Sequence, residues 1–403
     1  MNILVVSPYL PHPRSGHGGG EYVFGLLKHL SHDHNVTLVS FVDQHEGPFL
    51  EDIKNLNVSL HTVSRWKRDN KNILINAGLF FKRVGQLLLS ILFWEPFIIT
   101  RYRSFVMRGL IRNLTSEKQF DVVQIEFAQM GPYVNQVTCG KTFLRAHDVV
   151  YRPAFRSYMN SKNIVRKLVR YIELCRWYRY ERNLVRRFDH VLTFTEQDAS
   201  LLKRISSSPS VSCNPRGIDI PDIHPEYQRQ PFSLIFLGAL DLPSNADAAL
   251  WLAGEIFPRV RAQIPAATLT IIGKNPSAAL RSVIEGQPGI TLTGYVKEIE
   301  PYLMSASIFV APIRIGGGIK TKVLHAASWG IPVVTTPRGA EGIHGANSET
   351  VTVALTADGL AEGAVALMTD DTRSAEQARR ARIMVEMNYG WPVAIKHLVE
   401  LYS

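Results

Sequence analysis

The sequence predicts an α/β protein built from two consecutive doubly wound parallel sheets. Its 403 residues exceed what a single hydrophobic core usually organises. Short apolar runs alternate with segments of helical periodicity in two successive series, as in sheets whose parallel strands are joined by helices. Between the two series, the stretch SSSPSVSCNPRGIDIPDIHPEYQRQP is rich in serine and proline and breaks the alternation.

This break divides the chain into two domains. We expect a first domain at residues 1–212, a linker at 213–230 and a second domain at 231–385. The last segment, residues 386–403, is expected to form a helix that packs back on the first domain. Because such sheets bind ligands at the carboxyl ends of their strands, two sheets facing each other would hold a ligand in a central cleft.

The first series opens with the buried strand ILVVS at residues 3–7, a loop rich in proline and glycine, and a helix at 21–30. A strand at 36–41 completes a β-loop-α-β unit. Later elements of this series are strands at 122–126, 141–146 and 191–195 and a helix at 196–204. The second series has strands at 233–237, 268–272, 290–293, 308–311, 331–335 and 351–354, helices at 246–257 and 297–304, and two helices after the last strand.

Composition narrows the class of protein. With 46% hydrophobic and 20% charged residues, the chain has the make-up of a soluble globular protein. The N-terminus, MNILVVSPYLPHPR, lacks a basic region and meets proline early, so we interpret it as a strand and not as a signal peptide. The cysteines are widely spaced, which argues against a disulfide framework or a zinc site and fits a reducing, cytoplasmic compartment. They are Cys139, Cys175 and Cys213.

Charge is distributed unevenly along the chain. Residues 1–212 contain 29 Lys and Arg against 17 Asp and Glu, whereas the remaining 191 contain 16 against 18. The net charge of +12 on the first domain favours an anionic partner, and nucleic acid, anionic lipid or a phosphorylated acceptor would each fit. No nucleic-acid-binding module is recognisable in the sequence, so nucleic acid is not expected to be the partner.

Two segments of the first domain raise the question of membrane contact. Residues 80–99 are the most apolar in the chain, but their charge-free run is shorter than the ~20 residues that span a bilayer. They form either a buried or lid helix, which is the commoner case, or a helix lying in the membrane plane beside basic residues. Those neighbours are Lys82, Arg83, Arg101 and Arg103. Residues 162–187 add nine basic residues on a helical pattern, as either a solvated face or an interfacial one.

The stretch IGGGIKTKVLHAASWGIPVV predicts an anion site. Gly316, Gly317 and Gly318 leave backbone N–H groups accessible, and the helix that follows begins with unpaired N–H groups at its positive dipole end. Lys320 and Lys322 add full charges, but two residues apart on a helix they cannot share a face. The residues that do share one follow at intervals of three and four. They are Lys322, His325, Ala326 and Trp329.

A second glycine cluster follows the first strand. It comprises Gly16, Gly18, Gly19 and Gly20. A G-x-G-x-x-G dinucleotide fingerprint would need glycine where Glu21 stands, so NAD is not expected. The cluster is either a flexible turn or a loop that brings backbone amides to a ligand in the cleft.

With these residues in view, the chain resembles the glycosyltransferases of family 4, which have the GT-B architecture of two Rossmann-like domains. The resemblance covers nearly the whole length. In the first domain it rests on SPYLPHPRSGHGGGEYVFGLLKHL, FDVVQIEF, RAHD and RFDHVLTFTEQDASLL. The linker SCNPRGIDI is similar to the family's Pro-Asn-Gly-(Val/Ile)-Asp turn, with Arg216 in place of asparagine. In the second domain it rests on SLIFLGALDLPSNADAALWL, LTIIGKNP, ITLTGYVKEIEPYLMSASIFVAP and the most specific motif, GGGIKTKVLHAASWGIPVVTT.

The resemblance implies a retaining hexosyl transfer from a UDP- or GDP-type nucleotide sugar to an acceptor hydroxyl, without a metal or a cofactor. Fixed N–H groups and lysines would stabilise the charge that develops on the departing diphosphate, which itself would take the acceptor proton. The donor-binding residues so implied are Gly18, Gly19, Gly20, Gly238, Gly294, Tyr295, Val296, Gly316, Gly318, Ile319, Lys320, Thr321, Lys322 and His325. The catalytic residues so implied are His147, Gly317 and Lys320.

His147 would contact the donor sugar, and two carboxylates near it are candidates for acceptor contact. They are Glu126 and Asp148. Each has a structural alternative, because a His-Asp pair at a strand end is frequently a hydrogen-bonded pair and Glu126 fits equally well as a cap at the edge of the core.

The sequence departs from the family at the two glutamates of its E-x7-E motif. The first aligns with Gly317, as in a subgroup that carries the triple glycine, and the second aligns with His325. The usual glutamate accepts hydrogen bonds from ribose hydroxyls, whereas a neutral imidazole has one acceptor and one donor nitrogen. His325 is therefore either a ribose contact or a packed helix residue. GALDLPSNADA replaces the family's Gly-Arg…Lys-Gly phosphate element, so phosphate binding would rest more on Lys320 and Lys322.

The expected function is a cytoplasmic glycosyltransferase, peripheral on the inner face of the cytoplasmic membrane, that extends a lipid-linked or polysaccharide glycan intermediate. An anionic membrane surface is a candidate partner because the first domain is basic. One alternative is a catalytically degenerate binding or scaffold protein, which the residues at 317 and 325 suggest. Another is a GT-B nucleotide-sugar epimerase, which the lack of additional acid/base carboxylates at the motif positions disfavours.

Overall fold

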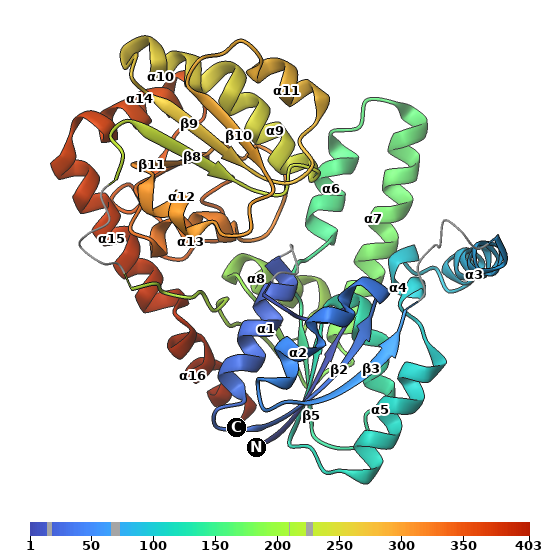
Figure 1. The fold of residues 1–403 in the computed structure, drawn as a ribbon. Coiled ribbons are helices and arrows are strands. Elements are labelled where there is room, and N and C mark those ends of the chain that lie inside the picture. The colour runs from blue at the N-terminus through green and yellow to red at the C-terminus, as the bar shows by residue number, and fades with distance from the viewer. Residues whose placement is uncertain (14–17, 66–72, 209, 223–228) are drawn as a thin grey trace. The chain divides into compact units, whose positions relative to one another are not determined.

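A computed structural model describes the chain except residues 14–17, 66–72, 209 and 223–228, and it leaves out the side chains of residues 44 and 73–82 (Figure 1). The chain divides into two compact units, each built on its own parallel sheet. Unit 1 comprises Met1–Arg216 and Ile395–Ser403, and unit 2 comprises Gly217–Ala394.

The sheet of unit 1 has the strand order β3-β2-β1-β4-β5-β6-β7. Its strands are β1 (Asn2–Ser7), β2 (Asn35–Val42), β3 (Ser59–Ser64), β4 (Val122–Glu126), β5 (Lys141–Arg145), β6 (His190–Thr193) and β7 (Val211–Cys213). Ile3 of β1 pairs with Val36 on one side and Val122 on the other, all in parallel. β4 is buried along its whole length although it contains Gln124 and Glu126, which is unusual for a central strand and indicates a polar site in the core.

Helices join the strands of this sheet, and α3, α6 and the start of α7 extend away from it (Figure 1). They are α1 (Gly18–Leu30), α2 (Leu50–Lys54), α3 (Ile73–Leu92), α4 (Phe97–Arg101), α5 (Phe105–Glu117), α6 (Tyr151–Met159), α7 (Ile164–Val185) and α8 (Glu196–Ser206), with 3-10 turns η1 (Gln44–Phe49) and η2 (Ala128–Gln136). Ser104, Asn163 and Thr195 begin α5, α7 and α8, and each accepts a hydrogen bond from a backbone N–H three residues on.

The sheet of unit 2 has the strand order β10-β9-β8-β11-β12-β13. Its strands are β8 (Ser233–Leu237), β9 (Thr268–Ile272), β10 (Ile290–Gly294), β11 (Ile308–Ala311), β12 (Val333–Thr335) and β13 (Thr352–Val353). Its helices are α9 (Pro243–Trp251), α10 (Phe257–Gln263), α11 (Ala278–Ile284), α12 (Glu300–Ser305), α13 (Thr321–Ser328), α14 (Ala357–Thr369) and α15 (Asp371–Tyr389), with a π turn η3 (Leu252–Ile256) between α9 and α10. A last helix, α16 (Trp391–Tyr402), begins in unit 2 and ends in unit 1.

The predicted α/β fold of two doubly wound parallel sheets is confirmed, while several element boundaries differ. The strands β3 and β7 were not predicted, because neither reads as an apolar run: β7 has the sequence VSC and is a strand only because it pairs with β6. The helix predicted at 246–257 begins earlier, at Pro243, and continues through the π turn to Gln263. Proline at a first helical position favours the start of a helix, which the apolar pattern alone does not reveal.

Among the helices within the described residues, none has the length and apolarity needed to cross a membrane.

A glycine at the start of unit 2 provides a test of the packing. A Cβ on Gly217 would lie 2.1 Å from a ring carbon of Trp391, whereas a Cβ on Gly109 in α5 would meet nothing within 4 Å. We expect Gly217→Ala to lower the free energy of unfolding by about 1–3 kcal/mol through overpacking. Gly109→Ala should raise it by about 0.5–1 kcal/mol, because alanine favours the helix. Thermal unfolding of both variants measures whether each substitution lowers or raises the stability, and equal changes in stability would contradict this packing.

Candidate functional site

Three glycines mark the carboxyl edge of the unit 2 sheet. Gly238 and Gly273 directly follow β8 and β9, and Gly294 is the last residue of β10. The N–H of Gly273 donates to the Gly294 carbonyl at 3.0 Å. A Cβ on Gly273 would lie 2.0 Å from the Gly238 carbonyl oxygen, so these strand ends come together only because position 273 lacks a side chain.

Lys322 brings a cation to this edge. Its Nζ donates to Asn245 Oδ1 at 2.6 Å and lies 4.7 Å from the ring centroid of Phe236. A Cβ on Gly238 would approach this Nζ to 2.5 Å, so the ammonium occupies the space that a side chain at 238 would fill. Although the residue as a whole is only half-buried, its charged end is therefore enclosed.

The enclosure changes the acidity of Lys322. Burial, with a smaller contribution from the neighbouring Lys320, lowers the pKa of Lys322 to about 7. Among the described residues, no carboxylate forms an ion pair with it. A cation held in such a place without a counter-ion is the electrostatic signature of a site for an anion.

The glycine loop before α13 has left-handed backbone angles at two positions. Gly316 has φ 110° and Gly318 has φ 65°, values that residues with a side chain rarely adopt. The Lys320 ammonium donates to the carbonyls of Gly317 and Gly318, at 2.5 and 2.8 Å, and so fixes the loop. The helix α13 then begins at Thr321, which places its first N–H groups directly after the loop.

The other predicted donor residues of unit 2 lie at the same strand ends. Tyr295 and Val296 follow β10, and Tyr295 is exposed while Val296 packs on the core. His325 is partly exposed on α13, but Ala326, which the helical spacing places on the same face, is fully buried. Ile319 packs against the core immediately before the helix. The described backbone thus brings these residues to the edge that also carries Lys322.

In unit 1, a buried chain of polar side chains ends at His147. Glu126 closes β4 and His147 follows β5, and His147 Nε2 lies 2.6 Å from Glu126 Oε2. The other Glu126 oxygen accepts a hydrogen bond from Gln124 Nε2 at 2.5 Å. Gln124 Oε1 in turn accepts from the hydroxyl of Tyr402, the penultimate residue of the chain. Because a carboxylate only accepts hydrogen bonds, His147 donates from Nε2 and keeps Nδ1 as its acceptor.

Aromatic rings enclose His147. Phe127 stacks on its imidazole with centroids 3.5 Å apart, and Tyr22 and Phe194 meet it edge-on at 5.4 and 5.1 Å. Burial lowers the pKa of His147 despite the hydrogen bond and the charge of Glu126, which raise it. The imidazole is therefore held in its neutral form.

The N-terminal glycines pack against this ring cluster. A Cβ on Gly19 would lie 2.5 Å from Phe127 and 2.6 Å from the Tyr9 hydroxyl, so glycine allows α1 to approach the rings around His147. The Gly18 carbonyl accepts a hydrogen bond from Arg216 at 2.5 Å. Gly20 is buried in the first turn of α1, whereas Gly16 lies outside the described residues.

Two buried arginines complete the surroundings of His147. Arg145 is fully buried and donates to the carbonyl and the side-chain oxygen of Asn214. The guanidinium groups of Arg145 and Arg216 both lie over the rings of Tyr22 and Phe194, at 5.2 to 6.0 Å. Asp148, the other acidic residue predicted here, is exposed.

Sequence reasoning missed four residues that shape the two sites: Phe127, Gln124, Tyr402 and Asn245. Gln124 had a usable signal, since a polar residue two positions before Glu126 in a buried strand lies on the same face. Asn245 had a weaker one in SNADA, the segment that replaces the family's phosphate element. Tyr402 had none, because its partner is 278 positions away.

Comparisons with known proteins agree with this arrangement. Residues 231–370 match the family model described as Glycosyl transferases group 1. The chain is 24% identical over 377 residues to an uncharacterized 44.6 kDa protein in the cps region of Klebsiella pneumoniae, which covers 87% of each chain.

Solved structures share the fold across the whole chain. The Anabaena protein HepE, solved with UDP and glucose, is 11% identical, with a TM-score of 0.68 over 98% of each chain. TarM of S. aureus is 11% identical, with a TM-score of 0.70 over 100% of this chain and 98% of its own. Sucrose-phosphate synthase from Thermosynechococcus elongatus is 13% identical, with a TM-score of 0.68 over 100% and 98%. The chain therefore has the GT-B fold, and its residues 231–370 are similar to the Glycosyl transferases group 1 family.

Proposed function

We propose that the chain is a retaining, metal-independent glycosyltransferase that moves a hexose from a nucleotide sugar to an acceptor hydroxyl. The observation that carries the proposal is the enclosed ammonium of Lys322, beside Gly238 and Asn245, in the domain that matches the glycosyl transferases. An anionic ligand accounts for a cation held there without a counter-ion, and a diphosphate supplies that charge. UDP is the first nucleotide to test, because the solved structures of HepE and TarM include complexes with UDP, and GDP is the alternative.

The residues at the carboxyl edge of the unit 2 sheet would make each contact with the donor. The diphosphate would bind Lys322 and the N–H groups of the Gly316–Gly318 loop and of the first turn of α13. Lys320 would act chiefly as a positioning residue, because its ammonium already binds the carbonyls of that loop. The backbone at residues 294–296 would meet the base, and His325 would meet the ribose.

The transfer itself needs charge stabilisation more than it needs a protein nucleophile. The bond from the sugar C1 to the phosphate oxygen breaks while the acceptor oxygen bonds to C1 on the same face. The acceptor proton passes to the leaving phosphate oxygen, so configuration is retained and no covalent sugar–enzyme intermediate forms. Lys322 and the α13 N-terminus would stabilise the diphosphate charge as it develops.

In unit 1, His147 is the proposed contact to the donor sugar. Its neutral imidazole, oriented by Glu126, suits a hydrogen bond to a sugar hydroxyl. Glu126 is fully buried and bound to His147, so we assign it an orienting role ahead of acceptor contact. Asp148 remains the candidate for acceptor contact. The acceptor is proposed to be a lipid-linked or polysaccharide glycan intermediate, with the protein in the cytoplasm on the inner membrane face.

A catalytically degenerate scaffold is the second candidate, because His325 and Gly317 replace the two glutamates of the family motif. Turnover with any nucleotide sugar excludes this alternative. If the protein binds the ligand but does not turn it over, and His325→Glu restores turnover, the scaffold is supported instead. An epimerase would release an altered nucleotide sugar in the absence of acceptor.

Thermal unfolding with a panel of UDP, GDP, ADP and their sugars tests the donor site. A ligand at about 100 times its dissociation constant stabilises the folded state by ~2.7 kcal/mol, which is a shift of a few degrees. We expect a shift with one base class. In Lys322→Met that shift should fall to about half or less at the same ligand concentration, since affinity is lost by about tenfold to 100-fold when a charged hydrogen-bond donor is removed.

Lys396→Met on α16 is the matched control, since Lys396 is exposed and its loss should leave the shift unchanged. Without ligand, Lys322→Met should unfold at the wild-type temperature or above it, because an enclosed cation is removed. An unaltered UDP shift in Lys322→Met would contradict the assignment of the diphosphate site.

The pH dependence of turnover tests the role of Glu126. Both the hydrogen bond and the charge of Glu126 raise the pKa of His147, so Glu126→Gln should lower it further. If neutral His147 is the active form, the acid limb of kcat/KM should move to lower pH. Glu173→Gln, on the exposed part of α7, should leave the limb in place. A move to higher pH would rule out this coupling.

A further inference from the structure

The exposed apolar residues of unit 1 are concentrated in one part of the chain. Large hydrophobic side chains usually lie exposed singly, and contiguous apolar surface marks a contact with a partner or a membrane. Every large exposed hydrophobic residue among the described part of unit 1 falls between positions 84 and 178. They are Val84, Leu87, Leu88, Leu89, Ile91, Leu92, Phe93, Trp94, Phe97, Phe105, Val106, Phe155, Met159, Ile164, Val165, Leu168, Val169, Tyr171 and Tyr178.

The two halves of α7 present apolar residues on opposite faces. In the C-terminal half, the buried stripe consists of Leu174, Trp177, Glu181 and Leu184, at intervals of three and four. Counting back from Leu174 in the same steps reaches Arg170, Lys167 and Arg166, all exposed. The apolar residues of the N-terminal half, including Leu168 and Val169, are therefore on the other side, where the core does not cover them.

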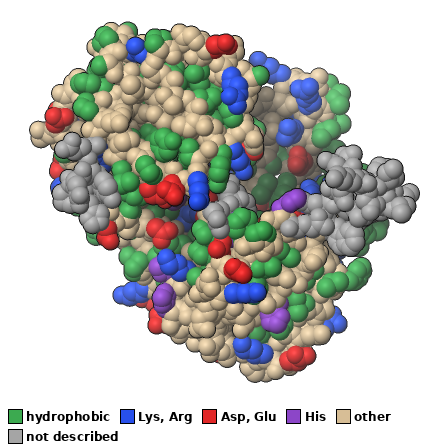
Figure 2. All heavy atoms as spheres, viewed as in Figure 1, with side chains coloured by type: hydrophobic (Ala, Val, Ile, Leu, Met, Phe, Trp, Pro, Cys, Tyr) green, Lys and Arg blue, Asp and Glu red, His purple; other side chains and the backbone are tan. Residues whose placement is uncertain are grey.

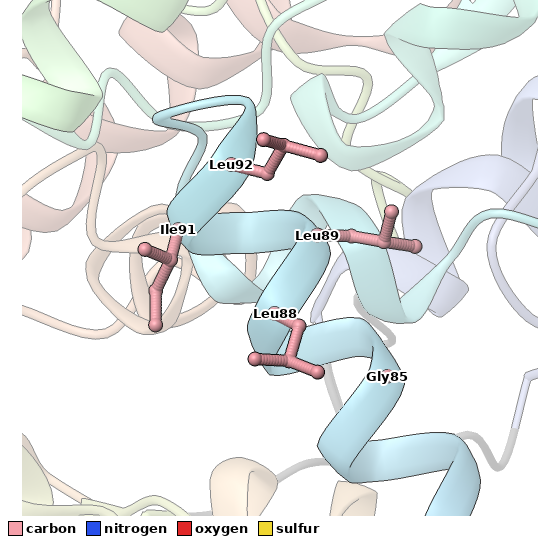
Figure 3. Close-up of a pocket in the computed structure, with 5 residues that line it drawn as sticks. All are labelled: Gly85, Leu88, Leu89, Ile91 and Leu92. Carbon is pink, nitrogen blue, oxygen red and sulfur yellow. The ribbon is translucent and has the colours of Figure 1, made fainter.

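The last turns of α3 expose apolar residues to solvent, while the polar Ser90 is buried. Figure 3 shows Leu88, Leu89, Ile91 and Leu92 projecting in different directions from the helix, and with Gly85 they line a hollow of about 550 Å³. Leu92 is 75% exposed and Leu88 is 61% exposed. Of the expected buried or lid helix, the buried form is therefore wrong for the described half of the segment. Contiguous exposed apolar side chains of this kind mark a contact that covers them.

A cation–ring contact joins the two helices. The Arg176 guanidinium of α7 lies 4.8 Å from the ring centroid of Trp94, just after α3. Arg176 follows Val169 by seven positions and Ile172 by four, so it lies on the same face of α7 as the exposed apolar residues. The segment after α3 is also fixed by Arg103, which donates two hydrogen bonds to Glu95 at 2.9 and 2.7 Å. The apolar surfaces of α3 and α7 thus meet at Trp94.

Basic side chains flank this apolar surface. Those on and beside α7 are Arg152, Arg156, Lys162, Arg166, Lys167 and Arg170, against the single acidic residue Glu173 in the N-terminal half of the helix. Arg83 lies on α3 and is exposed, and on α5 the Arg108 guanidinium lies 5.4 Å from the ring centroid of Phe105, which is 87% exposed. Figure 2 shows hydrophobic and basic side chains interspersed where α6 and α7 lie.

We propose that this surface, formed by the described end of α3, the first turn of α5, and α6 with the N-terminal half of α7, docks on an anionic bilayer leaflet. Apolar side chains would enter the acyl boundary while arginines and lysines pair with lipid phosphates, as in interfacial amphipathic helices. A second copy of the chain is the weaker candidate, because it would bring the same cations face to face. This surface rests on the peripheral location proposed above. Because its test does not use sugar transfer, the membrane proposal and the glycosyltransferase proposal can fail separately.

Flotation of the full chain with vesicles of equal parts phosphatidylglycerol and phosphatidylcholine is the test. Wild type should float with these vesicles and release as salt is raised. Leu168→Asp with Val169→Asp, and separately Leu88→Asp with Leu92→Asp, should each lower partitioning by about tenfold or more. Arg166→Glu with Lys167→Glu should also lower partitioning into anionic vesicles, since each cation near the membrane surface strengthens binding roughly fivefold.

The matched control is Leu355→Asp with Met387→Asp in unit 2, where the side chains are 78% and 69% exposed and binding should not change. Because all substituted residues are exposed, thermal unfolding should be unaltered, and a variant that unfolds early is replaced by the serine substitution at the same sites. Equal binding by wild type and the surface variants would overturn the proposal. So would wild type that does not float, or a vesicle-independent dimer that the α7 variant dissociates.

Discussion

The enclosed ammonium of Lys322 is the constraint on which the proposed donor site depends. It explains why position 238 is glycine, since any side chain there would displace the cation, and why Asn245 stands at the start of α9 to accept its hydrogen bond. Enclosing this cation is unfavourable, because burial works against the charged form and no carboxylate among the described residues offsets this. The proposed diphosphate would supply the missing negative charge.

The same use of glycine recurs in unit 1. Gly19 leaves room for Phe127, the ring that stacks on His147, just as Gly238 leaves room for Lys322. In both units, glycine lets a side chain of the candidate site approach the backbone closely. In unit 1 the buried chain from Tyr402 through Gln124 and Glu126 then fixes the imidazole, so the end of the polypeptide supports His147 from within the core.

The sequence was sufficient to predict what depends on local pattern. Apolar alternation predicted the two parallel sheets, and the run of glycines before Lys320 and Lys322 predicted a loop directly ahead of a helix. Contacts between distant segments, such as that of Asn245 with Lys322, could not be predicted from the sequence, because no periodicity links them. The exposed apolar half of α7 was equally hidden: its overall pattern mixes two opposite faces, and only the packing of Leu174 and Trp177 shows which face is buried.

The decisive measurement is the pKa of Lys322, determined by NMR on protein with ¹³C-labelled lysine and assigned with Lys322→Arg. We expect a pKa of about 7 in the free protein. Saturating UDP should raise it by at least about one unit, because a nearby negative charge favours the protonated amine. A pKa near the ordinary ~10.4 of lysine in the free protein, or a low value that UDP does not move, would contradict the claim that Lys322 is an enclosed cation awaiting a diphosphate.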